Sequence, residues 1–292
     1  MSRFTYARAH SVEEAVALLS DPNEKSVPLA GGTDLLVNIR KAPPTFTRVV
    51  DVRRVPEMRI IEVREAQLVI GAAVSYTELA ESALVQRYAT CLAQAARTVG
   101  GPAIANMGTL GGNIASAAPW ADALPPLICL DAHAHLRSVE GARSLPVAEL
   151  VLAPNQTRLR ANELITHFTL PLPAPDVQSV FLKVGHRIAQ TLSRANLAAA
   201  IGRDATGRIA TARLVVGTIV PVAQRFEEVE SLLIGQHPSP QLFVEAAARA
   251  AEGLVRRVGR HWATEYDTRV LKALVVRALR ATTAPSPTPE GV

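Results

Sequence analysis

Residues 28–35 read PLAGGTDL, a paired-glycine turn between an apolar run and a helical segment. The apolar residues from Val27 to Ala30 predict a short buried strand, and those from Asp34 to Arg40 predict a helix. Paired glycines after a strand let the backbone approach a ligand without an intervening Cβ atom, and successive N–H groups before a helix bind anions. The segment therefore predicts a strand–turn–helix unit that binds a diphosphate.

A second glycine turn, GTLGGN, occupies residues 108–113. The hydroxyls of Thr33 and Thr109 and the amide of Asn113 add polar groups to the two turns. Asp122 follows the second turn and can accept a hydrogen bond from a ribose or ribityl hydroxyl. Either turn taken singly is equally well explained as an ordinary tight turn. Together they predict a long ligand bound across two subdomains.

Several other kinds of site lack their sequence signatures. Neither turn reads G-x-G-x-x-G, and no G-x-x-x-x-G-K-[ST] occurs, so neither a Rossmann site nor a P-loop is expected. Cys91 and Cys129 stand alone, so the sequence predicts no iron–sulfur cluster or four-cysteine zinc site in this chain. His133 and His135 share one face of a predicted strand, but without a third ligand a solvated face is the favoured interpretation. With no nucleophile beside a paired base, we assign no catalytic residue and no metal ligand.

Composition limits the partners and the compartment. The 292 residues are 48% hydrophobic, and no apolar run approaches the roughly 20 residues of a membrane span. Residues 1–10 lack the apolar stretch of a secretory signal, so a cytoplasmic protein without a membrane span is expected. The net charge of +5 comes from dispersed arginines, and aromatic residues make up only 4%. This pattern argues against nucleic-acid binding.

Hydrophobic periodicity and capping signals predict a mixed α+β protein. Helices are expected at 12–20, 34–40, 75–84, 92–99, 226–234, 240–256 and 265–282. Strands are expected at 27–30, 49–52, 60–63, 67–71, 133–139, 164–170, 180–185, 195–201 and 209–216. Residues 100–131 show little periodicity and are predicted to be irregular, which in a compact protein usually signals a function.

The proline-rich segment from Pro171 to Pro175 is a stiff connector and marks a domain boundary. The prediction is an N-terminal domain of residues 1–175, with subdomains of about 1–57 and 58–175. A C-terminal domain of residues 176–282 and a flexible tail of residues 283–292 follow it.

The two turns together carry a family resemblance. AGGTDL at residues 30–35 with TLGGNI at 109–114 resembles the paired FAD signature of the medium subunits of the xanthine dehydrogenase and carbon monoxide dehydrogenase family. Further similar positions, over a resemblance from about residue 3 to 282, are Pro119, Asp122, Pro125, Leu130 to Ala132, Phe181 to Lys183, Arg187 and Tyr266 to Leu279.

The resemblance implies a fold and a cofactor site. The fold is the two-subdomain FAD-binding type of the vanillyl-alcohol oxidases, also called the PCMH type, followed by a C-terminal α+β domain. Residues 28–35 would hold the adenosine diphosphate part of FAD, and residues 109–113 the remaining phosphate and the ribityl region. The implied FAD-binding residues are Pro28, Leu29, Ala30, Gly31, Gly32, Thr33, Asp34, Leu35, Val99, Thr109, Leu110, Gly111, Gly112, Asn113, Asp122, Ile165 and Lys183.

For four of these residues the resemblance implies a particular position in the FAD site. Asp122 would lie near the ribityl chain, Ile165 would line the site, and Lys183 would approach the flavin from the C-terminal domain. Val99 stands where some relatives have an aromatic residue near the flavin ring.

The resemblance also implies an oxidoreductase subunit with partners. The chain would bind FAD within a molybdenum hydroxylase, a heterotrimer or its dimer, with a small iron–sulfur subunit and a large molybdopterin subunit. It would pass electrons to NAD, oxygen, a quinone or another carrier. Two alternatives remain open at this point: a stand-alone FAD-dependent oxidase or reductase of the same fold, and a non-redox nucleotide-binding module.

Overall fold

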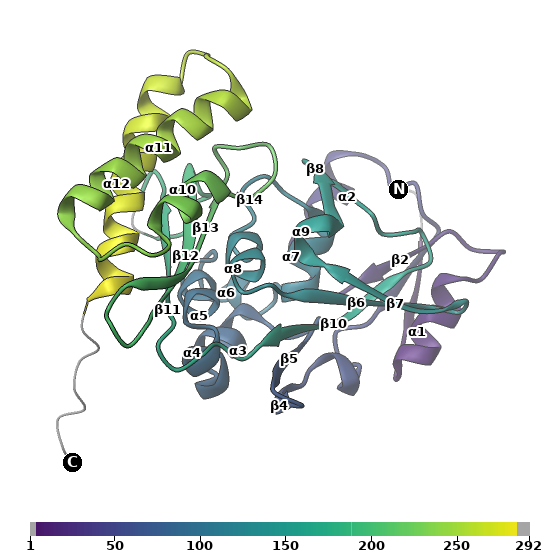
Figure 1. Ribbon diagram of the computed structural model, residues 1–292. Coiled ribbons are helices and arrows are strands. Elements are labelled where there is room, and N and C mark those ends of the chain that lie inside the picture. The colour runs from purple at the N-terminus through teal and green to yellow at the C-terminus, as the bar shows by residue number, and fades with distance from the viewer. Residues whose placement is uncertain (1–3, 188, 285–292) are drawn as a thin grey trace.

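The computed structural model describes residues 4–187 and 189–284, with three main sheets and helices around them (Figure 1). A small sheet near the N-terminus and a C-terminal sheet with two long helices lie at opposite ends of the molecule, and a five-stranded sheet lies between them (Figure 1). This mixture of separate sheets and helices confirms the predicted α+β class.

The N-terminal sheet contains three parallel strands, β1 (Thr5–Arg8), β3 (Arg48–Asp51) and β2 (Ser26–Leu29), in that order. Helix α1 (Val12–Leu19) begins as predicted, because the Ser11 side chain accepts from the backbone N–H of Glu14 and caps the helix. The glycine turn at 30–34 connects β2 to helix α2 (Leu35–Lys41). The strand–turn–helix unit predicted from PLAGGTDL is thus confirmed.

The central sheet is antiparallel, in the order β4 (Ile61–Arg64), β5 (Gln67–Gly71), β10 (Leu164–Pro171), β6 (His133–Ser138) and β7 (Gly141–Pro146). Its buried face carries fully buried side chains of the main core, including Leu68, Ile70 and Phe168. Helices α3 (Tyr76–Glu81), α4 (Ala83–Tyr88) and α5 (Thr90–Arg97) follow β5. The single helix expected at 75–84 is two helices, because Ser82 ends α3 and its side chain caps α4.

The prediction that residues 100–131 are irregular is wrong. They contain three short helices, α6 (Pro102–Ala105), α7 (Leu110–Ser116) and α8 (Leu124–Cys129). Helices of four to seven residues are too short to produce a periodic apolar pattern, and tertiary contacts stabilise them instead. Sequence periodicity likewise missed β1, β7, α9 (Val147–Leu150), β8 (Val151–Ala153), β9 (Gln156–Thr157) and β14 (Gln224–Arg225).

The C-terminal sheet is buried on both faces. Its order is β11 (Gln178–Val184), β12 (Ala195–Arg203), β13 (Ile209–Gly217) and β14. Leu197 and Ile201 of β12 pack into the core formed with α10 (Glu227–Leu233), α11 (Pro240–Val258) and α12 (Thr264–Thr283). Ala198 and Ala200 point the other way and join the core of the N-terminal half. Small side chains on that face let α5 and α8 pack closely against the sheet.

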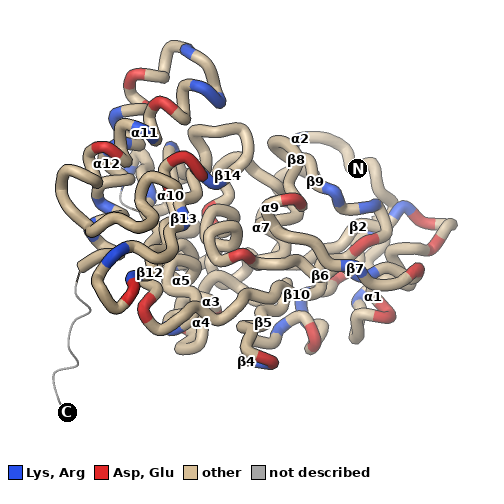
Figure 2. Tube along the Cα trace, in the orientation of Figure 1, with Lys and Arg blue, Asp and Glu red and all other residues tan. Residues whose placement is uncertain are grey.

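Charge is distributed in a mixed pattern over the molecule. Positive and negative segments alternate along the tube in Figure 2, and no block of one sign stands out in this view. Within the described ranges, no helix has the length and apolar character that crossing a bilayer requires. Most of the tail predicted as flexible, residues 285–292, lies outside the described part of the chain, whereas Thr283 ends α12.

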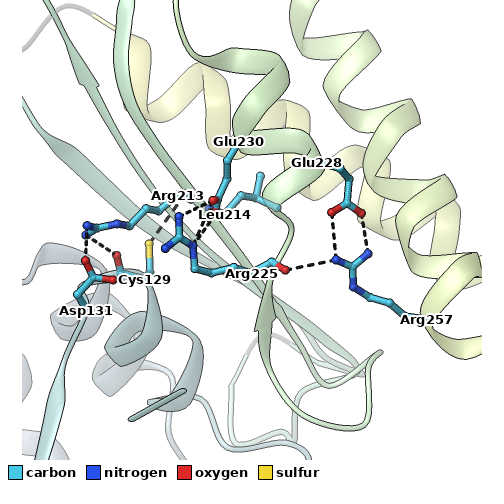
Figure 3. Close-up of polar contacts among 8 residues, drawn as sticks. All are labelled: Cys129, Asp131, Arg213, Leu214, Arg225, Glu228, Glu230 and Arg257. Carbon is cyan, nitrogen blue, oxygen red and sulfur yellow. Dashed lines mark hydrogen bonds and ion pairs between the residues drawn. The ribbon is translucent and has the colours of Figure 1, made fainter. Parts of the chain in front are cut away.

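An ion pair connects α10 to β14, and a hydrogen bond connects α10 to β13 (Figure 3). The Glu230 carboxylate, 4% exposed, accepts hydrogen bonds from the backbone N–H of Leu214 at 2.9 Å and from Arg225 Nη2 at 2.6 Å. These bonds to Glu230 raise the pKa of Arg225 above its ordinary value. Arg213 of β13 pairs with Asp131, which follows α8, and so links the two halves of the chain (Figure 3).

The Glu230 pair gives a stability prediction. Glu230→Ala leaves the Leu214 N–H without its partner and the partly exposed Arg225 guanidinium without its carboxylate, so we expect the free energy of unfolding to fall by about 1–3 kcal/mol. Urea denaturation measures the change. The control is Glu265→Ala, which removes an exposed pair with Arg269 and should have little effect. Equal losses in the two variants would contradict the prediction.

Two histidines stack on the central sheet. His135 of β6 lies opposite His167 of β10, with ring centroids 4.2 Å apart and planes 8° apart. Burial, the neighbouring His135 and the charge of Arg64 lower the pKa of His167 to about 4. Among the described residues, His133 and His135 form no metal-binding group with a third His, Cys, Asp or Glu. The stack is therefore a neutral, partly buried packing contact.

Because the pKa of His167 is lowered in the folded chain, we predict that the protein loses stability in acid. The unfolded chain binds a proton at His167 near the ordinary pKa of 6.5, whereas the folded chain binds it only near 4. The neutral His167 therefore makes its full contribution to the free energy of unfolding above pH 6.5, and this contribution is lost as the pH falls from 6.5 toward 4. We expect His167→Gln to flatten the dependence of the melting temperature on pH in this window, while the exposed His237→Gln leaves it unchanged. An unaltered slope in His167→Gln would show that the stack does not contribute.

Candidate functional site

A cavity of about 760 Å³ lies where segments of all three main sheets meet. Sixteen of the seventeen residues expected at the site line it, all except Leu110. The side chain of Leu110 is fully buried in the core, because its backbone N–H bonds to the Val74 carbonyl at 3.0 Å and turns the side chain inward. The structure therefore brings the two glycine turns together around one cavity.

The first glycine turn offers unused backbone donors. The N–H groups of residues 31–35 make no hydrogen bond within the described part of the chain. Asp34 precedes helix α2 but does not cap it, since its carboxylate accepts from the Asn38 side chain at 3.0 Å. Gly32 has φ of 70°, a left-handed conformation that favours glycine. The turn therefore presents a run of N–H donors that suits an anionic group.

The second glycine turn differs in this respect. The N–H of Gly111 bonds to the Ala72 carbonyl at 2.8 Å, and that of Gly112 bonds to the Thr109 hydroxyl oxygen at 3.1 Å. The N–H of Asn113 bonds to the Thr109 carbonyl at 3.0 Å. Unlike the first turn, this one therefore has no run of free N–H groups at residues 110–113. What it contributes to the cavity is surface and side chains, including the buried Oδ1 of Asn113, which has no hydrogen-bond partner among the described residues.

Gly31 and Gly111 also allow chain segments to pack closely against each other, which the sequence did not reveal. A Cβ on Gly31 would lie 1.8 Å from the Met107 carbonyl oxygen, and one on Gly111 would lie 2.6 Å from the Cβ of Ala72. Both contacts join chain segments to each other rather than to a ligand. Glycine is therefore required at these two positions for the fold itself, which assembles the cavity.

A buried ion pair lies at the wall of the cavity. Asp122 Oδ2 accepts from Lys183 Nζ at 2.5 Å, and the two side chains are 6% and 8% exposed. Asp122 Oδ1 accepts from the Ser193 hydroxyl at 2.5 Å and from Asn196 Nδ2 at 2.9 Å. Lys183 also donates to the Thr98 carbonyl at 3.1 Å. Lys183 is thus a buried, oriented cation, although a lysine at a strand is more often on the surface.

Sequence analysis missed several cavity residues. The segment from Arg187 to Leu192 between β11 and β12 contributes Arg187, Gln190, Thr191 and Leu192. Glu163 also lines the cavity, and two hydrogen bonds from Arg143, at 2.6 and 2.7 Å, hold the pKa of its carboxyl below the ordinary value. Trp120 lines the cavity with 45% of its surface exposed, so it is not a core residue.

Tyr76 is a further missed residue. Its side chain is 3% exposed and lines the cavity, and its hydroxyl has no hydrogen-bond partner in the described structure. Burial, and to a smaller extent the Asp122 carboxylate, raises the pKa of Tyr76 well above its ordinary value. The capping box of Ser75 and Glu78 located the start of α3 correctly. Nothing in the sequence, however, indicated that the next side chain turns toward the cavity.

The arrangement is suited to binding rather than to bond cleavage. It combines backbone donors at one turn, unpartnered polar atoms of Tyr76 and Asn113, and a cation paired with Asp122. The volume falls in the range of about 300–1,000 Å³ that is typical of ligand and cofactor sites.

Comparisons with known proteins agree along nearly the whole chain. A family model described as the FAD binding domain in molybdopterin dehydrogenase matches residues 2–173, and one described as the CO dehydrogenase flavoprotein C-terminal domain matches residues 180–282. The chain is similar to the xanthine dehydrogenase FAD-binding subunit of Escherichia coli O157:H7, with 32% identity over 228 residues and 77% of each chain covered.

Two further similarities concern carbon monoxide dehydrogenase of Hydrogenophaga pseudoflava. Its medium chain is 30% identical over 282 residues, with 96% of each chain covered. A solved structure of that enzyme, lacking the Mo-pyranopterin moiety of the molybdenum cofactor, matches with a TM-score of 0.88 and 29% identity. That match covers 97% of this chain and 98% of the other.

Tyr76 provides a test of the cavity geometry. A buried hydroxyl without a partner costs stability, so we expect Tyr76→Phe to raise the free energy of unfolding of the ligand-free protein by about 1 kcal/mol. The control is Tyr6→Phe, which removes a hydroxyl that bonds to Asp51 at 2.6 Å and should not stabilise the protein. Thermal unfolding without ligand measures both. Destabilisation by Tyr76→Phe would mean that its hydroxyl has a partner.

Proposed function

This chain belongs to the family of FAD-binding medium subunits of the xanthine dehydrogenase and carbon monoxide dehydrogenase type, and from this we propose that it binds FAD and transfers electrons to an external acceptor. The family resemblance and the two-part fold predicted from the sequence are confirmed. The chain is therefore a flavoprotein subunit of an oxidoreductase.

The observation that carries the proposal is the run of unused N–H groups at residues 31–35, which line the cavity. A diphosphate has several strong acceptor oxygens and negative charge, which such a run accommodates. The cavity extends from this turn past Asn113 to Lys183, so it accommodates an extended ligand with its anionic part at the first turn. The residues present therefore fit FAD.

We assign the site residues on this basis. Residues 28–35 hold the adenosine diphosphate part, with residues 31–35 supplying backbone donors. Thr109, Gly111, Gly112 and Asn113 line the region of the remaining phosphate and the ribityl chain, while Leu110 anchors this turn in the core. Val99 and Ile165 supply apolar surface.

Asp122 and Lys183 have a joint role in the proposal. The carboxylate already accepts three hydrogen bonds from protein groups, so its main function is to orient the Lys183 ammonium. An ammonium group at the wall of the cavity stabilises negative charge on a bound cofactor. The sequence-based expectation that Asp122 contacts the ribityl chain stays a prediction.

The electron chemistry belongs to FAD, which when bound would carry electrons from the iron–sulfur clusters of a small partner subunit to NAD, oxygen, a quinone or another carrier. A large molybdopterin subunit would complete a heterotrimer or its dimer. Relatives named as medium chains or FAD-binding subunits support this composition. The cytoplasmic location expected from the sequence stays a prediction.

We also propose the domain division expected from the sequence. An FAD-binding domain of residues 1–175, with subdomains of about 1–57 and 58–175, precedes a C-terminal domain of residues 176–282. The three main sheets support this division, because each one falls within one of these ranges.

The proposal is tested by titrating the purified chain with FAD and FMN and following the flavin absorption bands. We expect tight, stoichiometric binding of FAD, competition by ADP, and weak binding of FMN, since the first turn binds the adenine-bearing diphosphate. Gly32→Ala should weaken FAD binding about ten-fold. An alanine at φ 70° costs about 1–2 kcal/mol, and the turn can avoid this cost only by rotating its N–H groups away from the cofactor.

The matched control is Gly259→Ala. Gly259 has φ of 73° and open space around its Cα, but it lies at the end of α11 away from the cavity. This variant should lose stability without losing affinity for FAD. Equal affinity of the wild-type chain for FMN and FAD would contradict the assignment of the first turn. Turnover of a substrate by the isolated chain would favour the stand-alone oxidase or reductase.

A further inference from the structure

Asp122 connects the two halves of the chain beside the cavity. It precedes α8 in the N-terminal half, whereas its three donors, Lys183, Ser193 and Asn196, all belong to the C-terminal half. Ser193 is 6% exposed and Asn196 is fully buried. The carboxylate is therefore enclosed in a pocket of donors that the C-terminal sheet supplies.

The register of the C-terminal sheet places these groups side by side. Asn196 of β12 pairs with Lys183 of β11 on one side and with Gly217 of β13 on the other. A Cβ on Gly217 would lie 2.3 Å from Asn196 Oδ1. Glycine at this position therefore leaves space for the Asn196 amide, which donates to Asp122 at 2.9 Å.

The residue type at position 196 also matters for charge. The amide of Asn196 donates a hydrogen bond without adding charge, so the Asp122 and Lys183 pair stays neutral as a whole. An aspartate of the same shape would place a second carboxylate against Asp122. Two carboxylates at hydrogen-bonding distance repel each other, and one ammonium cannot neutralise both.

We infer that Ser193 and Asn196 are positioning residues: they fix the Asp122 carboxylate, which holds the Lys183 ammonium at the cavity wall, and so set the reduction potential of a bound flavin. This inference rests on the proposed function. Neither residue lines the cavity, so both act through Asp122 and Lys183. The C-terminal sheet thereby controls the charge near a cofactor whose anionic part the N-terminal half binds.

The test is the two-electron reduction potential of FAD bound to the full chain, measured at pH 8 with reference dyes. We expect Asn196→Asp to lower the potential, because an added negative charge disfavours electron uptake. The ratio of the affinities for reduced and oxidised FAD should fall on the order of ten-fold, as for one screened charge–charge interaction. Ser193→Ala, which removes one donor to Asp122, should lower the potential by a smaller amount.

Asn155→Asp is the matched control, since it adds the same charge at an exposed turn and should leave the potential unchanged. Oxidised FAD should still bind to both test variants, which separates an effect on potential from a loss of folding. FAD binding with an unchanged potential in Asn196→Asp and Ser193→Ala would overturn this inference alone. A wild-type chain that binds no FAD would overturn the proposed function and this inference with it.

Discussion

The close approach of Gly31 to the Met107 carbonyl is the constraint on which the cavity depends. A side chain at this position would overlap that oxygen, with its Cβ only 1.8 Å away. The contact brings the turn after β2 against the segment before α7, although about 75 residues separate them in the sequence. Without it, the turn with free donors and the turn with polar side chains would not border one cavity.

The two glycine turns look alike in sequence and have different physical roles. The N–H groups of residues 31–35 find no acceptor within the described part of the chain. The turn at 109–113 uses its N–H groups to bind the end of the central sheet, at Ala72 and Val74, and to cap its own helix. One turn therefore has N–H donors available for an anion, whereas the other uses its N–H groups to attach to the end of the central sheet.

The long elements could be predicted from the sequence because their patterns are local. Strand β12 has nine residues that are almost all buried, and helix α11 has nineteen residues with a recurring buried face, so the predicted ends of both lie within about two residues of the observed ones. The glycine pairs likewise located both turns. The bonding of the Leu110 and Gly111 N–H groups could not be predicted, since it depends on the carbonyl groups of Val74 and Ala72, which are about 35–40 residues away in the sequence. The turn of Tyr76 toward the cavity, and the four-residue helix α6, depend on packing in the same way.

The position of Asp122 explains why such a cavity needs a second domain. A buried ammonium is stable only when a carboxylate and further acceptors compensate for its lost hydration. The N-terminal half supplies Asp122 and the Thr98 carbonyl, and the C-terminal half supplies Lys183 with the two donors that hold the carboxylate in place. Neither half alone can bury this charge. The cation at the cavity wall therefore exists only while the C-terminal sheet is docked on α5 and α8, and the electrostatics of the site depend on that docking.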